Sequence, residues 1–156
     1  MASKRSQISM TPDEVDAYLR DGTKVMNVAT ISPSGHPHLV AMWYGFLGDE
    51  PVFWTFAKAQ KVLNLRRDDK LTVLVETGDK YEELKGVELV GRGRLIDDYD
   101  TVLQIGLSVA GRYQGPAALS DAARPFVEAQ ARKRIGVAIE IDKVVSWDHS
   151  KLAGTY

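Results

Sequence analysis

The connections between the strand-like segments of this chain are short, and this feature constrains its fold more than any other. Segments that alternate polar and apolar residues, or that are rich in β-branched and aromatic residues, predict strands. Six strands are predicted, at residues 24–31, 38–46, 52–56, 71–76, 87–96 and 135–145. Only one short helix interrupts the first four strands, whereas a parallel sheet would need a crossover after nearly every strand. The sequence therefore predicts a mainly β fold with flanking helices, built as a six-stranded antiparallel barrel that is closed or nearly closed.

Helices are predicted around these strands. Thr11 followed by Pro12 and Glu14 is typical of a capping box, and Gly22 ends the helix that begins there. The remaining helices are predicted at residues 57–68, 97–112 and 121–134.

The chain is expected to form a single domain over residues 1–156, with residues 1–10 as a loose N-terminal arm. Gly91 and Gly93 fall inside the long strand at 87–96, where paired glycines indicate a bend or a bulge. No repeat or low-complexity segment divides the chain.

Composition excludes several classes of protein. The 20 basic side chains nearly balance the 21 acidic ones, so no strong field attracts nucleic acid or an anionic membrane. No apolar run is long enough to cross a bilayer, and the start does not resemble a secretory signal. Cysteine is absent, which fits a cytoplasmic protein. With only three scattered histidines, at 36, 38 and 149, no metal site is expected.

The predicted helix that follows the third strand has an unusual distribution of charge. Helix N-termini carry partial positive charge and normally attract Asp or Glu. Here the first turns carry Lys58 and Lys61, and no carboxylate occurs before Asp68. Either both lysines are solvated, or an anion such as a phosphate lies between them. We favour the anion, because two ammonium groups beside a positive helix end destabilise it.

Motifs for several common chemistries are missing. The sequence has no phosphate-binding glycine loop, no dinucleotide fingerprint and no G-x-S-x-G nucleophile elbow. No side chain can be assigned as catalytic, so the sequence leaves the catalytic residues unknown. Trp43 and Trp54 are expected in the core, and Trp147 as a plug of the barrel or a dimer contact.

Two stretches of sequence resemble a known family. Residues 29–44, followed by Trp54-Thr55 and then residues 61–68, are similar to the flavin-binding split-barrel proteins, the group that includes pyridoxamine 5′-phosphate oxidase. Within that group, residues 64–68, residues 106–116 and the tail at 146–152 are similar to the actinobacterial reductases that use the deazaflavin coenzyme F-420. The resemblance covers residues 10–152.

The resemblance implies a split β-barrel homodimer with the cofactor at the subunit interface. Thr55 and Lys61 would hold its phosphate with Lys58 beside them, and Asn64 and Arg67 would reach the acidic tail of a deazaflavin. Tyr81 would be presented to the partner subunit's site. The second strand would line the ring system through His38, Leu39, Val40, Ala41 and Met42. That strand lacks the basic residues with which the oxidases bind phosphate and pyridoxal, so the resemblance does not extend to pyridoxamine oxidation.

Three functions follow as hypotheses. The first is an F-420-dependent oxidoreductase that transfers a hydride between the reduced cofactor and a small conjugated or heteroaromatic substrate. The second is the same fold with FMN or another large planar ligand as its cofactor. The third is a non-catalytic protein that binds or sequesters a cofactor or a fatty acid.

Overall fold

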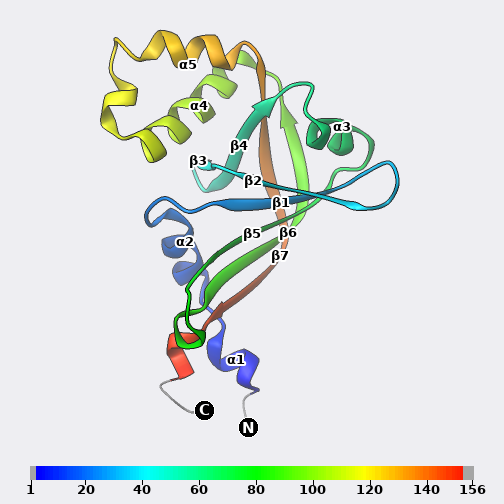
Figure 1. Ribbon diagram of the computed structural model, residues 1–156, viewed down its shortest axis with the longest axis vertical. Coiled ribbons are helices and arrows are strands. Elements are labelled where there is room, and N and C mark those ends of the chain that lie inside the picture. Colours follow the sequence, from blue (N-terminus) through cyan, green and yellow to red (C-terminus); the bar gives the residue numbers. More distant parts are fainter. Residues whose placement is uncertain (1–2, 153–156) are drawn as a thin grey trace.

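A single antiparallel sheet forms the body of the protein (Figure 1), and the computed structural model describes residues 3–152. The sheet has seven strands in the order β2-β1-β5-β6-β7-β4-β3. The strands are β1 (Met26–Ile31), β2 (Pro37–Met42), β3 (Gly45–Leu47), β4 (Glu50–Phe56), β5 (Lys70–Thr77), β6 (Lys85–Ile96) and β7 (Arg134–Asp148). The helices are α1 (Lys4–Ile8), α2 (Pro12–Arg20), α3 (Gln60–Arg67), α4 (Tyr99–Gln114) and α5 (Arg124–Ala131), with short 3-10 turns η1 (Tyr81–Glu83), η2 (Pro116–Leu119) and η3 (His149–Leu152).

The prediction of six strands was wrong, because the second predicted strand is two strands. The chain leaves the sheet at Trp43 and Tyr44, where the backbone N–H of Tyr44 donates to the Tyr113 hydroxyl of α4. The buried Tyr44 hydroxyl donates to the Leu19 carbonyl at 2.6 Å. These contacts with helices turn the chain, and β3 pairs with β4 at the opposite edge of the sheet from β2. The sheet is therefore an antiparallel half-barrel whose two edge strands are consecutive in the sequence.

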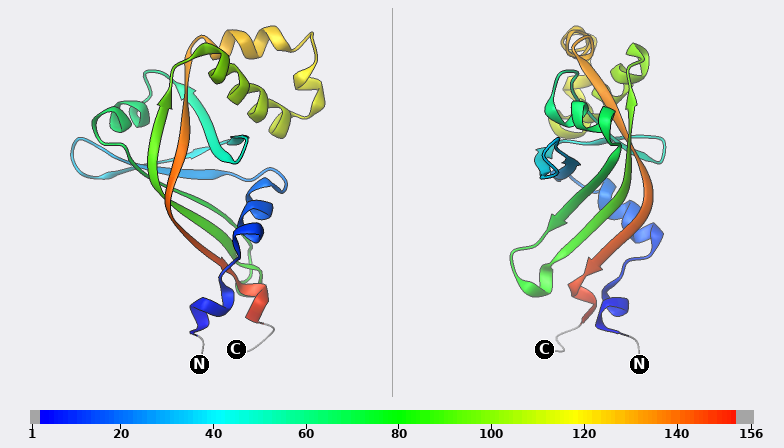
Figure 2. Two further views of the ribbon diagram at one scale, coloured as in Figure 1. Left: turned by 180° about the vertical axis from the view of Figure 1, so that it is seen from behind. Right: turned by 90° about the vertical axis from the view of Figure 1, so that its right-hand side faces the viewer.

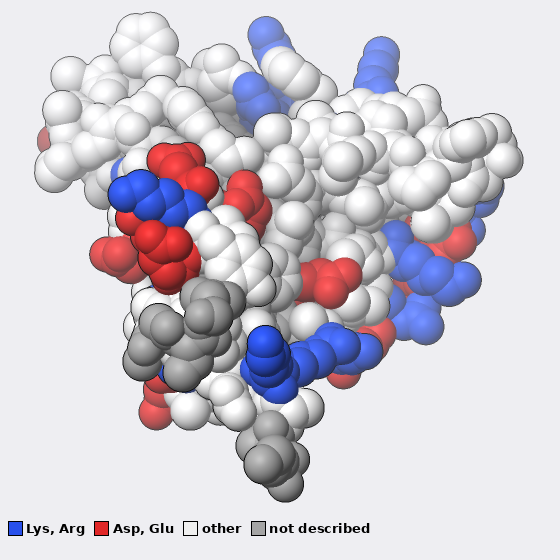
Figure 3. Space-filling view, turned by 60° about the horizontal axis from the view of Figure 1, so that its bottom comes forward, with Lys and Arg blue, Asp and Glu red and all other residues white. Residues whose placement is uncertain are grey.

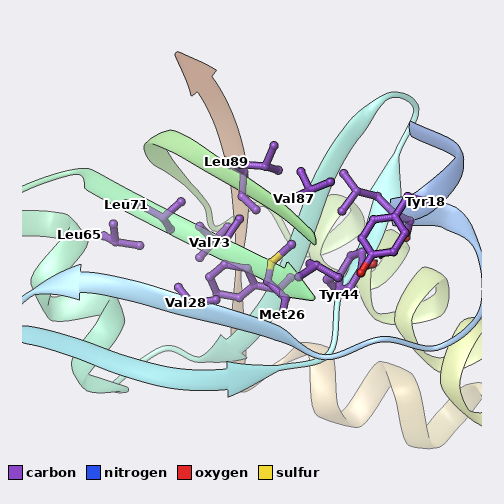
Figure 4. Close-up of a cluster of buried hydrophobic side chains, with 14 of the residues drawn as sticks. Tyr18, Met26, Val28, Tyr44, Leu65, Leu71, Val73, Val87 and Leu89 are labelled. Carbon is purple, nitrogen blue, oxygen red and sulfur yellow. Dashed lines mark hydrogen bonds between the residues drawn. The ribbon is translucent and has the colours of Figure 1, made fainter. Parts of the chain in front are cut away.

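Two apolar cores lie on opposite faces of β4. Met26, Tyr44 and Leu89 belong to the core inside the half-barrel (Figure 4), and Phe53 of β4 packs into the same core. Val52 packs on the other face, beneath α4 and α5. Because side chains alternate along a strand, Thr55 points to the same face as Phe53. This alternation places a hydroxyl at the end of the half-barrel that α3 covers.

The bulge predicted from the glycines of the long strand is confirmed. The β6–β7 register shifts between Val90 and Gly91. A Cβ on Gly91 would lie only 1.8 Å from the carbonyl oxygen of Glu140, so this close approach requires glycine. The bulge bends the two longest strands, which helps the sheet to curve.

Helix α1 and the 3-10 turn η3 lie beside one another at one end of the molecule (Figure 2). The capping box of α2 is confirmed, with Thr11 and Glu14 bonded to each other's backbone N–H. Residues 1–10 are not simply a loose arm, because α1 is helical and Met10 is buried in the half-barrel core; residues 1–2 lie outside the described part. The predicted tail at 146–152 instead extends β7 and continues into η3, and Trp147 packs against Gly86. No helix of the described residues is both long enough and apolar enough to cross a membrane.

Candidate functional site

Helix α3 begins without the usual N-terminal stabilisation. Its N-cap residue is Ala59, which makes no side-chain cap bond, and its first turn carries no acidic residue. Lys61 lies in that first turn. The predicted distribution of charge is present in part, because Lys61 lies in the first turn whereas Lys58 precedes the helix. A helix end of this kind favours an anion.

Lys61 is buried beside Thr55. Only 7% of the lysine and 4% of the threonine are exposed, and Lys61 Nζ donates to Thr55 Oγ1 at 3.1 Å. No carboxylate of residues 3–152 lies within 4.0 Å of this ammonium group. Burial lowers the pKa of Lys61. A buried cation without a counter-charge is unfavourable, so an anionic group bound here would stabilise the site.

Asn64 and Arg67 join α3 to β1. Asn64 is fully buried and its Nδ2 donates to Thr30 Oγ1 at 3.0 Å, while Gln60 Nε2 donates to Asn64 Oδ1 at 2.8 Å. Arg67 Nη2 donates to the Ile31 carbonyl. These bonds fix the position of Lys61 relative to the sheet. That Asn64 and Arg67 contact a cofactor tail stays a prediction; in the structure, their hydrogen bonds hold the helix in place.

Strand β2 presents two different faces. Leu39 and Ala41 are exposed, whereas Val40 and Met42 pack against the half-barrel core. His38 lies directly opposite Thr30 in the β1–β2 pairing and therefore points to the same face. Its Nδ1 is buried and has no hydrogen-bond partner within the described part of the chain. Such a nitrogen gains from a polar ligand group nearby.

Lys58 and Tyr81 lie outside this cluster. Lys58 is exposed in the turn that precedes α3. Tyr81 lies in η1, where its ring meets His149 edge-on at 4.5 Å and its carbonyl oxygen lies 2.9 Å from His149 Nδ1. Strand β5 runs from α3 to η1 (Figure 1). Its eight residues span about 25 Å in an extended strand. Tyr81 could reach a site at α3 only from a second chain.

A pocket of about 560 Å³ lies between the end of β2, strand β4 and helices α4 and α5. Ala41 and Met42 line it, as do two tryptophans and an arginine that the sequence did not indicate as ligand contacts. Trp43 is 49% exposed and stacks on Tyr113 with ring centroids 4.7 Å apart, so its predicted place in the core was wrong. Trp54 is half-buried against Gly106 of α4. Only the pairing of distant strands brings these residues together.

The described residues offer little for acid–base or metal chemistry. They include no group of three or more His, Asp or Glu side chains that could hold a metal ion. The polar groups at α3 are cationic or neutral, and they suit anion binding. The arrangement suits the binding of an anionic group at the start of α3.

The chain belongs to the pyridoxamine 5′-phosphate oxidase family, whose model matches residues 11–148. It is 37% identical to the conserved hypothetical protein Rv2991 from Mycobacterium tuberculosis, over 99% of this chain and 95% of that one, with a TM-score of 0.91. It also shares its fold with an F-420 reductase, at 22% identity and a TM-score of 0.64 over 82% of this chain and 94% of that one. HutZ, a haem storage protein from Vibrio cholerae, has the same fold at 12% identity and a TM-score of 0.66, over 88% and 96% of the two chains. The comparison with curated proteins found no match.

Proposed function

We propose that this protein is an oxidoreductase that uses the deazaflavin coenzyme F-420, with the cofactor phosphate held at the start of α3. The observation that carries the proposal is the buried ammonium of Lys61, whose hydrogen-bond partner is the Thr55 hydroxyl. A phosphate would supply the missing counter-charge, and the uncapped N–H groups of α3 would add to the binding. His38 lies opposite Thr30 and on the same face of the sheet, and its buried Nδ1 would provide a further polar contact for the cofactor.

Further cations on α3 favour a deazaflavin over FMN. Arg66 and Arg67 are both exposed on the last turn of the helix, and Lys58 is exposed in the turn before it. One phosphate does not need so many positive charges, whereas the glutamate tail of F-420 carries several carboxylates. The sequence resemblance to the F-420 reductases at residues 64–68 and 106–116 supports the same choice.

The protein would contribute orientation and the exclusion of water. When bound, the deazaflavin supplies the carbon that carries the hydride. Strand β2 would lie against its ring through Leu39 and Ala41, two of the exposed side chains of that strand. The pocket beyond Ala41 is large enough for a small substrate and is lined largely by apolar side chains.

We also propose that two chains assemble with two-fold symmetry around two such sites. Large apolar side chains are exposed on strands of the half-barrel, among them Leu39 on β2, Phe56 on β4 and Ile141 on β7. The face in Figure 3 carries charged side chains in separate groups, with a broad uncharged area above them in this view. A second chain covering such a surface would shield the cofactor from water and would bring Tyr81 to the partner's site.

A cofactor titration tests the proposed function. The purified protein is titrated with F-420, FMN and haemin at physiological salt, and binding is followed by fluorescence quenching and absorbance. We expect F-420 to bind most tightly. Lys61→Ala should weaken its binding by about 1.5–3 kcal/mol, the range for a charge-assisted hydrogen bond. Lys143→Ala is the control, because this lysine is exposed on β7 outside the cluster. Tighter binding of FMN or haemin, or no effect of Lys61→Ala, would overturn the proposal.

A further inference from the structure

The pocket between the sheet and helices α4 and α5 contains a positive charge among aromatic rings. Its walls include Trp43, Trp54 and Phe126, and Arg134 lies at its side. Phe126 is 75% exposed and Trp43 is 49% exposed, so both present ring surface that the chain itself leaves uncovered. Such surfaces suit a planar apolar ligand.

The register of the sheet holds Arg134 in place. Arg134 on β7 pairs with Phe56 on β4, and Trp54 lies two residues away on the same face. The guanidinium therefore stacks over both rings, 4.3 Å from the Phe56 centroid and 4.8 Å from the Trp54 centroid. The amide oxygen of Gln130 accepts from Nε at 3.2 Å and from Nη2 at 3.0 Å. These contacts fix the plane and direction of the guanidinium.

Arg134 is a cation without an acidic partner. Within residues 3–152, no carboxylate lies within 4.0 Å of its guanidinium, and its Nη1 makes no hydrogen bond. Eight other arginines or lysines of the described part have such partners, among them Arg94 with Glu50 and Arg92 with Asp69. Burial lowers the pKa of Arg134, but a guanidinium remains charged at neutral pH. An anion with a flat, two-oxygen geometry would complement it best.

We propose that this pocket binds planar aromatic or heteroaromatic carboxylates, with the ring against Trp43 and Phe126 and the carboxylate at Arg134. The assignment of such a molecule as the substrate rests on the proposed function, because the pocket continues from the strand that would line the cofactor ring. Binding of the carboxylate does not depend on that function. The proposal narrows the substrate from any small conjugated compound to one that carries an acidic group beside its ring.

Calorimetric titration of the protein without added cofactor tests the binding. The probes are 2-naphthoate and its neutral analogue 2-naphthamide, which has the same ring and nearly the same shape. We expect naphthoate to bind about tenfold more tightly than naphthamide, a difference of about 1.4 kcal/mol. Arg134→Met should remove that preference while leaving the affinity for naphthamide within about twofold. Arg132→Met is the matched control, because Arg132 is exposed and contacts Tyr99 outside the pocket.

The comparison of the two probes on the unchanged protein keeps the test valid even if Arg134→Met does not fold. Equal affinity for both probes, or equal effects of Arg134→Met and Arg132→Met, would overturn the proposal. A repeat with saturating F-420 separates substrate from cofactor. If naphthoate still binds when F-420 is bound, the pocket can hold a substrate beside the cofactor. If F-420 displaces naphthoate, the pocket belongs to the cofactor, and the proposal of an aromatic carboxylate as substrate is overturned. A failure of the proposed function gives a different result: F-420 does not bind, while naphthoate still binds.

Discussion

Lys61 shows how a single buried charge can indicate a ligand. Its ammonium group is removed from water, receives one hydroxyl contact from Thr55 and has no carboxylate beside it within the described residues. Such a residue reduces the stability of the protein alone and is favourable once an anion is bound. The same residue therefore links the stability of the protein to the occupancy of its site.

This link predicts how stability depends on pH. Burial lowers the pKa of Lys61 in the folded protein, while in the unfolded chain it is about 10.4. Between these two pKa values the unfolded state binds more protons than the folded state, so the free energy of unfolding rises with pH. Below both values Lys61 is charged in both states, and its burial destabilises the folded protein by the full amount. We expect Lys61→Met to raise the free energy of unfolding relative to the parent protein at pH 8. This advantage should shrink as the pH approaches about 10.4.

Urea denaturation of both proteins without cofactor, across this pH range, measures the difference. Other groups titrate in both proteins and cancel when one free energy is subtracted from the other. If the difference in the free energy of unfolding between the two proteins does not change with pH, then the charge of Lys61 is not buried in the folded protein.

At the scale of elements, the site depends on how α3 is attached to β1. The amide of Asn64 and the hydroxyl of Thr30 are both buried and bonded to each other. The helix is only eight residues long, and so short a helix owes its position to tertiary contacts more than to its own stability. The location of Lys61 is thus determined by a side-chain contact between distant segments.

Asn64→Ala tests this attachment. The substitution leaves the Thr30 hydroxyl buried without its partner, and we expect a loss of about 1–3 kcal/mol in the free energy of unfolding. F-420 affinity should fall as well, since α3 is no longer fixed. Leu63→Ala is the control on the same helix. Leu63 is 49% exposed, so its replacement should lower the free energy of unfolding much less. Normal stability with weakened F-420 binding would instead show that Asn64 contacts the cofactor directly.

The bulge of β6 provides a second test at this scale. A methyl group at Gly91 would collide with the backbone of Glu140, which cannot move without disturbing the pairing of the longest strands. We expect Gly91→Ala to destabilise the protein by about 3 kcal/mol or more. At Gly22, which has φ 62° and open space around it, alanine should cost only about 1–2 kcal/mol. Thermal unfolding of both variants gives the comparison, and similar losses would argue against a tight bulge.

At the scale of the whole molecule, the half-barrel leaves apolar surface exposed beside the proposed site. We expect a homodimer, with a mass of twice 17.3 kDa by light scattering at low micromolar concentration. Tyr81→Ala should then weaken F-420 binding without changing that mass, because Tyr81 would act on the partner's cofactor. A monomer of 17.3 kDa that still binds F-420 would rule out the shared site.

The sequence by itself determined much of the fold and part of the site. Short connections and alternating strands specified an antiparallel sheet, the capping box specified α2, and the sequence indicated that the first turn of α3 carries a lysine and no acidic residue. That an anion binds there stays a prediction. These features were predictable because each depends on neighbouring residues, whose spacing is visible in the sequence.

Only the tertiary structure decided the rest. The break at Trp43 and Tyr44 arises from contacts with α2 and α4, about 25 and 70 positions away in the chain, so no local pattern showed it. The same reason applies to Asn64 against Thr30, and to Arg134, which meets Trp54 and Phe56 only through the register of β4 and β7. Which side chains share a pocket depends on strand pairing over long distances, and neither composition nor periodicity encodes that pairing in a readable form.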